Sequence, residues 1–257
     1  IAPISDASCD MLIGAGCVNR VTGAWVGNVS GGLGHNYRRA FENRDEAAVK
    51  LRDHSNFSIG MALMAGAYGM PYAPMRSILG SDIIKSNPEF LEAENPFSDA
   101  KEPVILVPPL IPDVTILVVP RADAHGNNHF WGSRGVAQEA ALAAEKVIVL
   151  AEEIVAPEVI ASDPSRVLVP GYRVDAVCHV PAGGHPSPMT GTWRRDSDFF
   201  NDYHKRSRTV EGFAEWLDEW VFGVADHAAY RAKLGAGLGD LKITGQALAA
   251  PVNYAAV

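Results

Sequence analysis

The sequence predicts an α/β protein with an open, largely parallel sheet flanked by helices. Residues 114–119 (VTILVV) and 146–151 (KVIVLA) are strand-sized apolar runs, which are typical of parallel strands covered on both faces. Between them, residues 134–145 (RGVAQEAALAAE) are rich in alanine and other good helix formers. A helix that joins two such strands makes them parallel neighbours, so these segments predict one strand–helix–strand unit.

The remaining elements follow from local patterns. Further strands are expected at residues 18–25 and 166–169, and further helices at residues 36–49, 56–68 and 211–224. The last helix carries an apolar stripe, formed by Phe213, Trp216, Leu217, Trp220 and Val221. The stripe indicates a helix that docks either on the core or on a partner chain. Residues 183–195 are rich in Gly, Pro, Ser and Thr, which predicts a loop.

Composition excludes several classes of protein. The 257 residues include 22 basic and 30 acidic side chains, for a net charge of −8, and 47% are hydrophobic. This acidic, core-forming composition argues against a disordered chain and against a general nucleic-acid binder. No apolar run reaches the roughly 20 residues that span a bilayer, and nothing at the start reads as a signal peptide. The three cysteines are an odd number and lack CxxC spacing, so neither a disulfide framework nor a zinc site is expected. These features together predict a soluble cytoplasmic protein.

Length sets the domain expectation. At about 150 residues per domain, the chain corresponds to one large or two small domains. We expect one α/β domain over residues 1–240 and a weakly specified C-terminal tail over residues 241–257. The sequence begins Ile-Ala-Pro-Ile, as if partway along a strand.

Most catalytic motifs are absent from the sequence. Neither a G-x-G-x-x-G fingerprint nor a phosphate-binding GxxxxGK[ST] loop is present, and HExxH and G-x-S-x-G also fail to match. His125, His129, His179 and His185 share no metal-ligand spacing, so no metal site is expected. Glu152 and Glu153 end a strand as neighbours, and at most one of them can face a site.

A glycine-rich loop at residues 25–37 (WVGNVSGGLGHNY) is the strongest candidate site. Glycine lets a backbone approach a ligand closely. The N–H groups at the start of the following helix can then receive an anion or a developing oxyanion. An equally good interpretation is a tight turn that binds nothing.

Three other polar clusters interrupt apolar surroundings: His54-Ser55-Asn56, Gly80-Ser81-Asp82 and Asp123–Asn127. Each has a structural explanation as a helix cap or a turn. The third cluster follows the best predicted strand, and ligands of open parallel sheets collect beyond the carboxyl ends of strands.

Several long blocks carry a family resemblance. They read LIGAGCVNRVTGAWVGN, GGLGHNYRRAFE, HSNFSIGMALMAGAYGMPYAPMRSILGSD, PDVTILVVPRADAHGNNHFWGSRGVAQEAALAAEKVIVLAEEIV and VDAVCHVPAGGHPS. From about Ile1 to about Val221 the chain resembles the α subunits of family I CoA-transferases, glutaconate CoA-transferase in particular. The resemblance implies the CoA-transferase/sugar-phosphate isomerase-like fold and an active site between an α and a β subunit. In this family a further strand–helix unit precedes the position of Ile1, and the resemblance implies that it is missing here.

The resemblance also implies a mechanism. In the family a β-subunit glutamate attacks the acyl-CoA thioester, and a mixed anhydride and then a glutamyl-CoA thioester carry the exchange. No catalytic residue is therefore expected in this chain, whose part is to shape the acyl pocket and stabilise oxyanions. The implied partner is a β subunit in an (αβ)₂ heterotetramer. Coenzyme A thioester is the substrate, and no permanently bound cofactor is implied.

Matching positions supply the implied substrate- and oxyanion-binding residues, with Ser30 the foremost candidate for substrate contact. They are Gly27, Asn28, Ser30, Gly31, Gly32, Gly34, Ser55, Asn56, Gly80, Ser81, Asp82, Gly126 and Asn127. Two alternatives stay open. Some relatives are ring-opening hydrolases of CoA thioesters, in which an α-chain acid acts near the His54-Ser55 position, and Asp53 would be that acid here. The other alternative is a non-catalytic subunit that only binds acyl-CoA.

Overall fold

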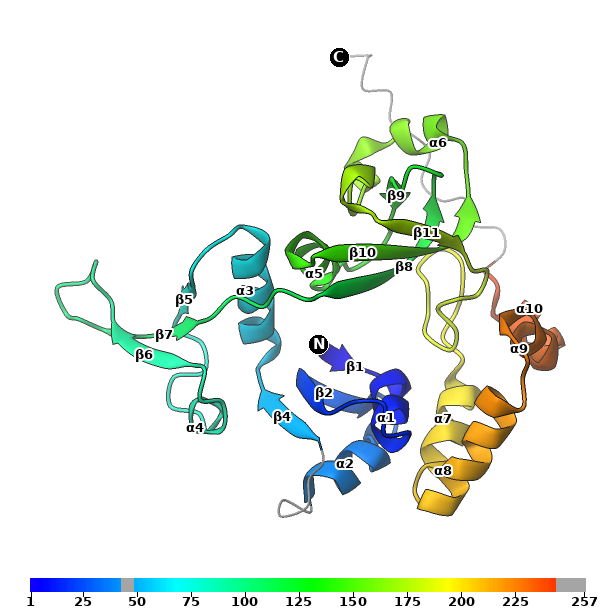
Figure 1. Ribbon diagram of the computed structural model, residues 1–257, viewed down its shortest axis with the longest axis horizontal. Helices are drawn as coiled ribbons and strands as arrows, with labels where there is room; N and C mark the ends of the chain where they lie inside the picture. Colours follow the sequence, from blue (N-terminus) through cyan, green and yellow to red (C-terminus); the bar gives the residue numbers. More distant parts are fainter. Residues whose placement is uncertain (43–48, 244–257) are drawn as a thin grey trace. The chain divides into compact units, whose positions relative to one another are not determined.

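The computed structural model describes residues 1–42 and 49–243, which form two compact units (Figure 1). Of the described residues, unit 1 comprises residues 1–42, 49–110 and 197–224, and unit 2 comprises residues 111–196 and 225–243. The sequence correctly predicted an α/β architecture, in which the central strands are parallel and helices flank them.

Unit 1 is built on a small sheet in which β2 (Arg20–Asn28) pairs in parallel with β1 (Ala2–Ser5) and with β4 (Lys50–Asp53). In register, Ile4 lies opposite Trp25 and Asp53 lies opposite Gly23. A short β3 (Gly32–Leu33) folds back antiparallel on the end of β2. The carboxyl ends of β2 and β4 therefore point the same way, toward one edge of this sheet.

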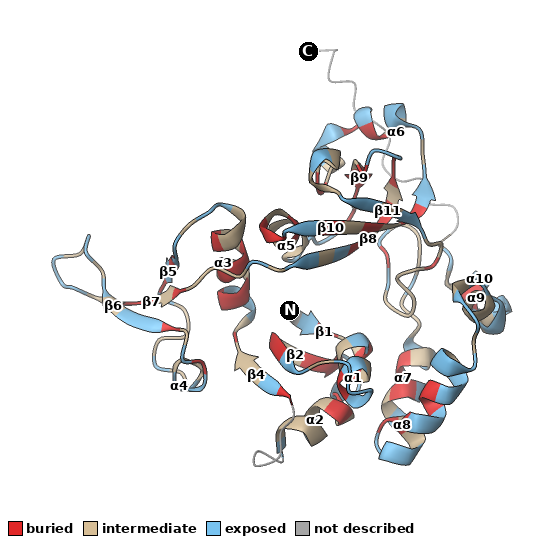
Figure 2. Cartoon of the chain, in the orientation of Figure 1, coloured by how far each residue is buried: buried red, intermediate tan, exposed pale blue. Residues whose placement is uncertain are grey.

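Three helices accompany this sheet: α1 (Ala7–Gly14), α2 (His35–Glu42) and α3 (Asn56–Ala67). A second, antiparallel sheet has the order β5-β7-β6, with β5 at Ala73–Met75, β6 at Leu91–Glu94 and β7 at Pro103–Val107. Its core forms where Met75, Ile105 and Val107 pack with Ala62 of α3. Figure 2 shows the run of buried residues along α3. The short α4 (Ile83–Ser86) lies between β5 and β6 in sequence.

Unit 1 is completed by a late segment of the chain. Helices α7 (Ser197–Arg206) and α8 (Val210–Leu217) belong to it, and α8 continues as a π-helical turn over Asp218–Phe222. Phe213, Trp216 and Leu217 are buried with Ala7, Phe200 and Tyr203. Most of the apolar stripe thus docks on its own unit: Trp216 is only 2% exposed and unavailable to a partner chain, whereas Val221 stays 40% exposed.

Unit 2 contains a sheet of order β11-β10-β8-β9. Strands β8 (Val114–Ala122), β10 (Lys146–Ile154) and β11 (Ala176–His179) are parallel neighbours, and β9 (Asn128–His129) is antiparallel. The predicted strand–helix–strand unit is confirmed, with α5 at Ala137–Ala143 between β8 and β10. The other helices of unit 2 are α6 (Pro157–Ala161), α9 (His227–Leu234), α10 (Ala236–Leu241) and the 3₁₀ turns Pro164–Arg166 and Gly171–Arg173.

Some expectations were wrong. Residues 166–169 form no strand: Arg166 ends a 3₁₀ turn, and Val167 makes only an isolated bridge with His129. The β8 strand is not covered on both faces, because Ile116 is 62% exposed whereas Val119 is fully buried. The helix expected at residues 36–49 ends at Glu42; residues 43–48, like residues 244–257 of the expected tail, lie outside the described residues.

Among the helices that the structure describes, none combines the length and the apolar character required to cross a membrane. The loop predicted at residues 183–195 is confirmed. Its regular features are two isolated bridges, one between Met189 and Trp193 and one between Trp193 and Lys242.

Candidate functional site

The glycine-rich loop is a β-hairpin between β2 and β3. Gly27 pairs with Leu33 and Asn28 with Gly32, and the Gly31 N–H donates to the Asn28 carbonyl at 2.9 Å. Gly32 has a φ of +101°, a conformation that side chains disfavour. A Cβ on Gly27 would overlap the backbone of Gly32. Glycine is thus required both for the turn and for the close approach of the two strands.

The side chain of Asn28 stabilises the hairpin and ties it to α7. This side chain is buried at 2% exposure; Oδ1 accepts from the Ser30 N–H at 2.9 Å, and Nδ2 donates to the Phe200 carbonyl of α7 at 3.1 Å. The tip above it is exposed, with Val29 at 71%. Asn28 is therefore an internal brace, and Ser30 is the polar side chain that the tip presents to solvent.

The expected anion site is largely satisfied from within the chain. The N–H groups of Ser30 and Gly31 already donate to Asn28. At the N-terminus of α2, the Tyr37 N–H donates to Asp10 Oδ1 at 2.7 Å, so the carboxylate of Asp10 caps this helix. Neither the turn nor this helix end can offer those donors to a ligand without rearrangement.

The residues after β4 start α3. Ser55 and Ser58 form a capping box, in which the Ser58 N–H donates to Ser55 Oγ at 3.0 Å and the Ser55 N–H donates to Ser58 Oγ at 2.9 Å. The hydroxyl of Ser55 is thus used as a helix cap, while Asn56 is exposed. Because β2 and β4 are parallel neighbours, Ser55, Asn56 and the hairpin all follow the carboxyl ends of adjacent strands.

Two titratable groups precede the α3 cap. His54 is 3% exposed, and its Nδ1 lies 3.1 Å from Ser58 Oγ. Burial, assisted by the charge of Arg52, lowers the pKa of His54 to about 4, so the ring is neutral near pH 7. Burial also raises the pKa of Asp53, against the opposing effect of the Ser86 hydroxyl at 3.5 Å.

The Gly80–Asp82 cluster directly precedes α4, with Asp82 at its N-cap position. Asn87, directly after α4, contacts the end of β4, because its Nδ2 donates to the Asp53 carbonyl at 3.0 Å. Gly80 has a φ of +76° and Ile78, a β-branched residue, has a φ of +67°, which is a strained conformation for such a residue. Ser81 Oγ donates to the Ile78 carbonyl at 2.7 Å, and Asp82 pairs with Lys85 in solvent.

Gly126 and Asn127 belong to unit 2, in the turn after β8. Asp123 organises this turn by accepting from the N–H groups of His125 and Asn127 and from Asn127 Nδ2. The turn lines a cavity of about 350 Å³. On β10, Glu152 is buried and accepts a hydrogen bond from the Ala182 N–H, whereas Glu153 is exposed. Adjacent residues of a strand point to opposite faces, which accounts for this difference.

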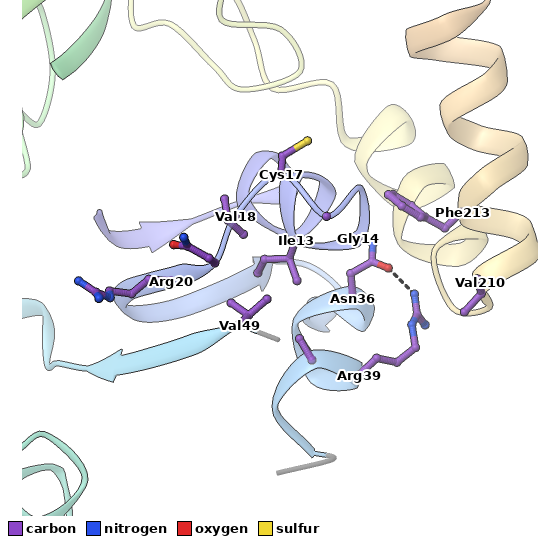
Figure 3. Close-up of a pocket in the computed structure, with 13 residues that line it drawn as sticks. Ile13, Gly14, Cys17, Val18, Arg20, Asn36, Arg39, Val49, Val210 and Phe213 are labelled. Atoms are coloured by element: carbon purple, nitrogen blue, oxygen red, sulfur yellow. Dashed lines mark hydrogen bonds between the residues drawn. The ribbon is translucent and has the colours of Figure 1, made fainter. Parts of the chain in front are cut away.

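A cavity of about 870 Å³ lies in unit 1 (Figure 3). Ile13, Val18, Arg20, Val49 and Phe213 are among its lining residues, and none of the predicted site residues lines it. It lies by Arg20, at the start of β2, whereas ligands of parallel sheets bind beyond strand carboxyl ends. We therefore do not place the substrate site there.

Sequence reasoning missed Asp10, Phe200 and Tyr203, which contact the hairpin or its exit into α2. The one signal for α7 was the helical spacing of Phe199, Phe200 and Tyr203. Asp10 carried no signal beyond being an acid within a short helix. Among the described residues, no group of three or more His, Cys, Asp or Glu side chains could hold a metal ion.

Comparisons with known proteins identify the class. A family model described as Coenzyme A transferase matches residues 2–179. The crystal structure of glutaconate coenzyme A-transferase from Acidaminococcus fermentans aligns with a TM-score of 0.87 at 31% identity, over 95% of this chain and 82% of that one. The chain belongs to the coenzyme A transferase family.

Within the family, the similarity is to the α subunits. The chain is 38% identical over 232 residues to the A subunit of the 3-oxoadipate CoA-transferase of Pseudomonas knackmussii, a match that covers 90% of this chain and 81% of the relative. It is also 28% identical over 205 residues to the cholesterol ring-cleaving hydrolase IpdA subunit of Mycobacterium tuberculosis, over 75% and 69% of the two chains. The resemblance to family I CoA-transferase α subunits is thereby confirmed.

Proposed function

We propose that this chain is the α subunit of a heteromeric acyl-CoA:carboxylate CoA-transferase, in which it shapes the acyl and CoA site opposite a glutamate of a β subunit. The observation that carries the proposal is the hairpin tip. It is exposed and braced by Asn28, yet it presents backbone and one hydroxyl instead of an acid. In the part of the chain that the structure describes, no base is hydrogen-bonded to the Ser30 hydroxyl, which supports a nucleophile supplied by the β subunit.

The hairpin, Ser55, Asn56 and the start of α4 form the proposed substrate-facing surface of unit 1. Gly126 and Asn127 are proposed separately as substrate-binding residues of unit 2. Support comes from the position of the first group beyond the carboxyl ends of β2 and β4. Strained backbone at Ile78 supports the same assignment, because strain of this kind clusters at functional sites. The proposed assembly with the β subunit is (αβ)₂, with a CoA thioester and a small carboxylic acid as substrates.

Covalent trapping on the purified αβ complex tests the proposal. The complex is incubated with acyl-CoA, reduced with borohydride and analysed by mass spectrometry. A reduced glutamate on the β subunit, together with acyl exchange, supports a transferase. Exchange without any modified β carboxylate overturns the mechanism, and binding without exchange indicates a non-catalytic acyl-CoA-binding subunit.

The role of Ser30 is tested on the same complex. We expect Ser30→Ala to lower kcat/KM by about ten-fold or more, since removal of one oxyanion donor costs roughly 10²–10³ in rate. Ser98→Ala, in the turn between β6 and β7, is the matched control and should leave kcat/KM unchanged. Equal kcat/KM values for the two variants would show that Ser30 is not part of the substrate site.

A second candidate is a ring-opening hydrolase of the same fold. Asp53 favours it, because burial raises the pKa of this carboxyl and so suits it to proton transfer. For this reaction Asp53→Asn should abolish turnover while no β carboxylate is trapped. A transferase should instead retain its trapped glutamate in Asp53→Asn.

A further inference from the structure

Helix α7 packs against the glycine-rich hairpin. Phe200, Tyr203 and His204 are spaced so that they share one face of the helix. The Phe200 carbonyl accepts from Asn28 Nδ2, and the Tyr203 hydroxyl donates to Asp10 Oδ2 at 2.7 Å. The His204 ring lies so close to Gly31 that a Cβ there would come within 2.8 Å of it. We call these three residues of α7, together with Asp10, the platform.

Asp10 links the platform to the end of the hairpin. Its carboxylate, 1% exposed, accepts from the Tyr203 hydroxyl, from the Tyr37 N–H at 2.7 Å and from Asn36 Nδ2 at 3.2 Å. A Cβ on Gly34 would overlap this carboxylate. Charge-assisted hydrogen bonds of this kind are short and strong, and a buried carboxylate that loses a donor is costly. The chain leaving the hairpin is thus held against a fixed anion.

From this geometry, and resting on the proposed function, we propose that Asp10 and Tyr203 are positioning residues that set the catalytic geometry of the hairpin. Both side chains are buried, at 1% and 2% exposure, so they act through the hairpin and do not touch substrate. Burial and the neighbouring Asp10 raise the pKa of Tyr203, which keeps the phenol protonated as a donor. The tip itself is exposed, and its shape depends on the anchors at Asn28 and Gly34 on either side.

A misplacement of about 1 Å can cost on the order of 10²-fold in rate. Loss of one platform contact should therefore lower kcat more than it raises KM. We expect Tyr203→Phe to lower kcat by about ten-fold with KM for acyl-CoA within about two-fold of wild type. The phenyl ring keeps the packing against Trp216, whose ring centroid lies 4.9 Å away.

The experiment compares wild type, Tyr203→Phe and Tyr230→Phe in the αβ complex. Tyr230→Phe is the matched control, because it also deletes a hydrogen-bonded tyrosine hydroxyl, the one 2.6 Å from His185 Nδ1 in unit 2. Hydrogen exchange at the amides of Ser30, Gly31 and Tyr37 is measured beside kcat and KM. Faster exchange at these amides together with a lower kcat, in Tyr203→Phe alone, is the expected result.

Unchanged hydrogen exchange at the hairpin in Tyr203→Phe would overturn the proposed role of the platform. An equal fall in kcat in Tyr203→Phe and Tyr230→Phe would overturn it too. If Tyr203→Phe does not fold, Asp10→Asn takes its place, because its amide oxygen can still accept from the Tyr37 N–H. The same measurements, amide exchange at the hairpin and kcat, then test the proposal. If wild type transfers no CoA, the proposed function fails, while the exchange data still decide whether the platform orders the hairpin.

Discussion

Buried carboxylates hold turns in both units of this protein. In unit 1, Asp10 binds the backbone at the start of α2; in unit 2, Glu152 binds the Ala182 N–H beyond β10. Ala182 has a φ of +58°, which costs free energy for a residue with a side chain. In each case an acid far away in sequence fixes a conformation that the turn does not specify by itself.

Gly34→Ala tests how firmly Asp10 is held. The added methyl would collide with a carboxylate that three donors fix in place, so we expect a loss of about 1–3 kcal/mol in the free energy of unfolding. Urea denaturation is the measurement. Gly237→Ala, where a Cβ meets nothing within 4 Å, is the control and should be neutral or stabilising by up to ~1 kcal/mol.

His54 makes stability depend on pH. Its pKa falls from 6.5 in the unfolded chain to about 4 in the folded one, so between these values the unfolded state binds more protons. Stability therefore rises with pH through this window and is lost as pH falls from about 6.5 toward 4. At about 1.4 kcal/mol per pKa unit, the full effect is on the order of 3 kcal/mol.

His54→Gln should flatten this dependence. Urea midpoints of wild type and variant at pH 5 and pH 7 provide the measurement. We expect the variant to be less stable at pH 7, because the contact with Ser58 is altered, but to change less between the two values. A variant with the same pH slope as wild type would show that another group controls this window.

At the scale of elements, α8 stabilises the site indirectly. It covers α7 through Phe213 and Trp216, and α7 in turn contacts the hairpin. The first turn of α8 is fixed by Thr209, whose hydroxyl accepts from the Gly212 N–H at 3.0 Å. The Thr209 cap is therefore linked to the hairpin only through α8 and α7.

Thr209→Ala should lower the free energy of unfolding by about 1 kcal/mol, because it deletes the N-cap acceptor. Thr209→Ser keeps that acceptor and should lie close to wild type. Thermal denaturation of both variants measures the difference. Equal melting temperatures for the two would mean that the cap contributes nothing to this helix.

Elements with a local signal were predictable from sequence, and elements defined by distant partners were not. The alanine-rich helix between two apolar strands predicted the β8–α5–β10 unit, because composition and period agree there. Strand β1 and helix α7 are short or polar and gain their stability from packing, so the strand-like start of the sequence and the spacing of Phe199, Phe200 and Tyr203 gave only weak signals for them. For the candidate site, glycine spacing identified the hairpin, but the partners of Asp10 lie up to 193 residues away.

On the scale of the whole molecule, unit 1 is discontinuous and unit 2 interrupts it. Residues 197–224 return to unit 1 only after the chain has passed through residues 111–196. They bring the Phe200, Tyr203 and Trp216 side chains that cover α1. The first unit to begin is therefore not completed by the residues that directly follow it.

This arrangement has a consequence for synthesis. A ribosome adds roughly 5–20 residues per second, so Asp10 waits on the order of 10–40 s for the phenol of Tyr203, 193 residues later. Meanwhile β8, β10 and β11, which all lie within residues 111–196, can emerge and pair. Until residues 197–224 emerge, the apolar side of α1 that carries Ala7 and Met11 lacks the cover that Phe200, Tyr203 and Trp216 give it in the folded protein.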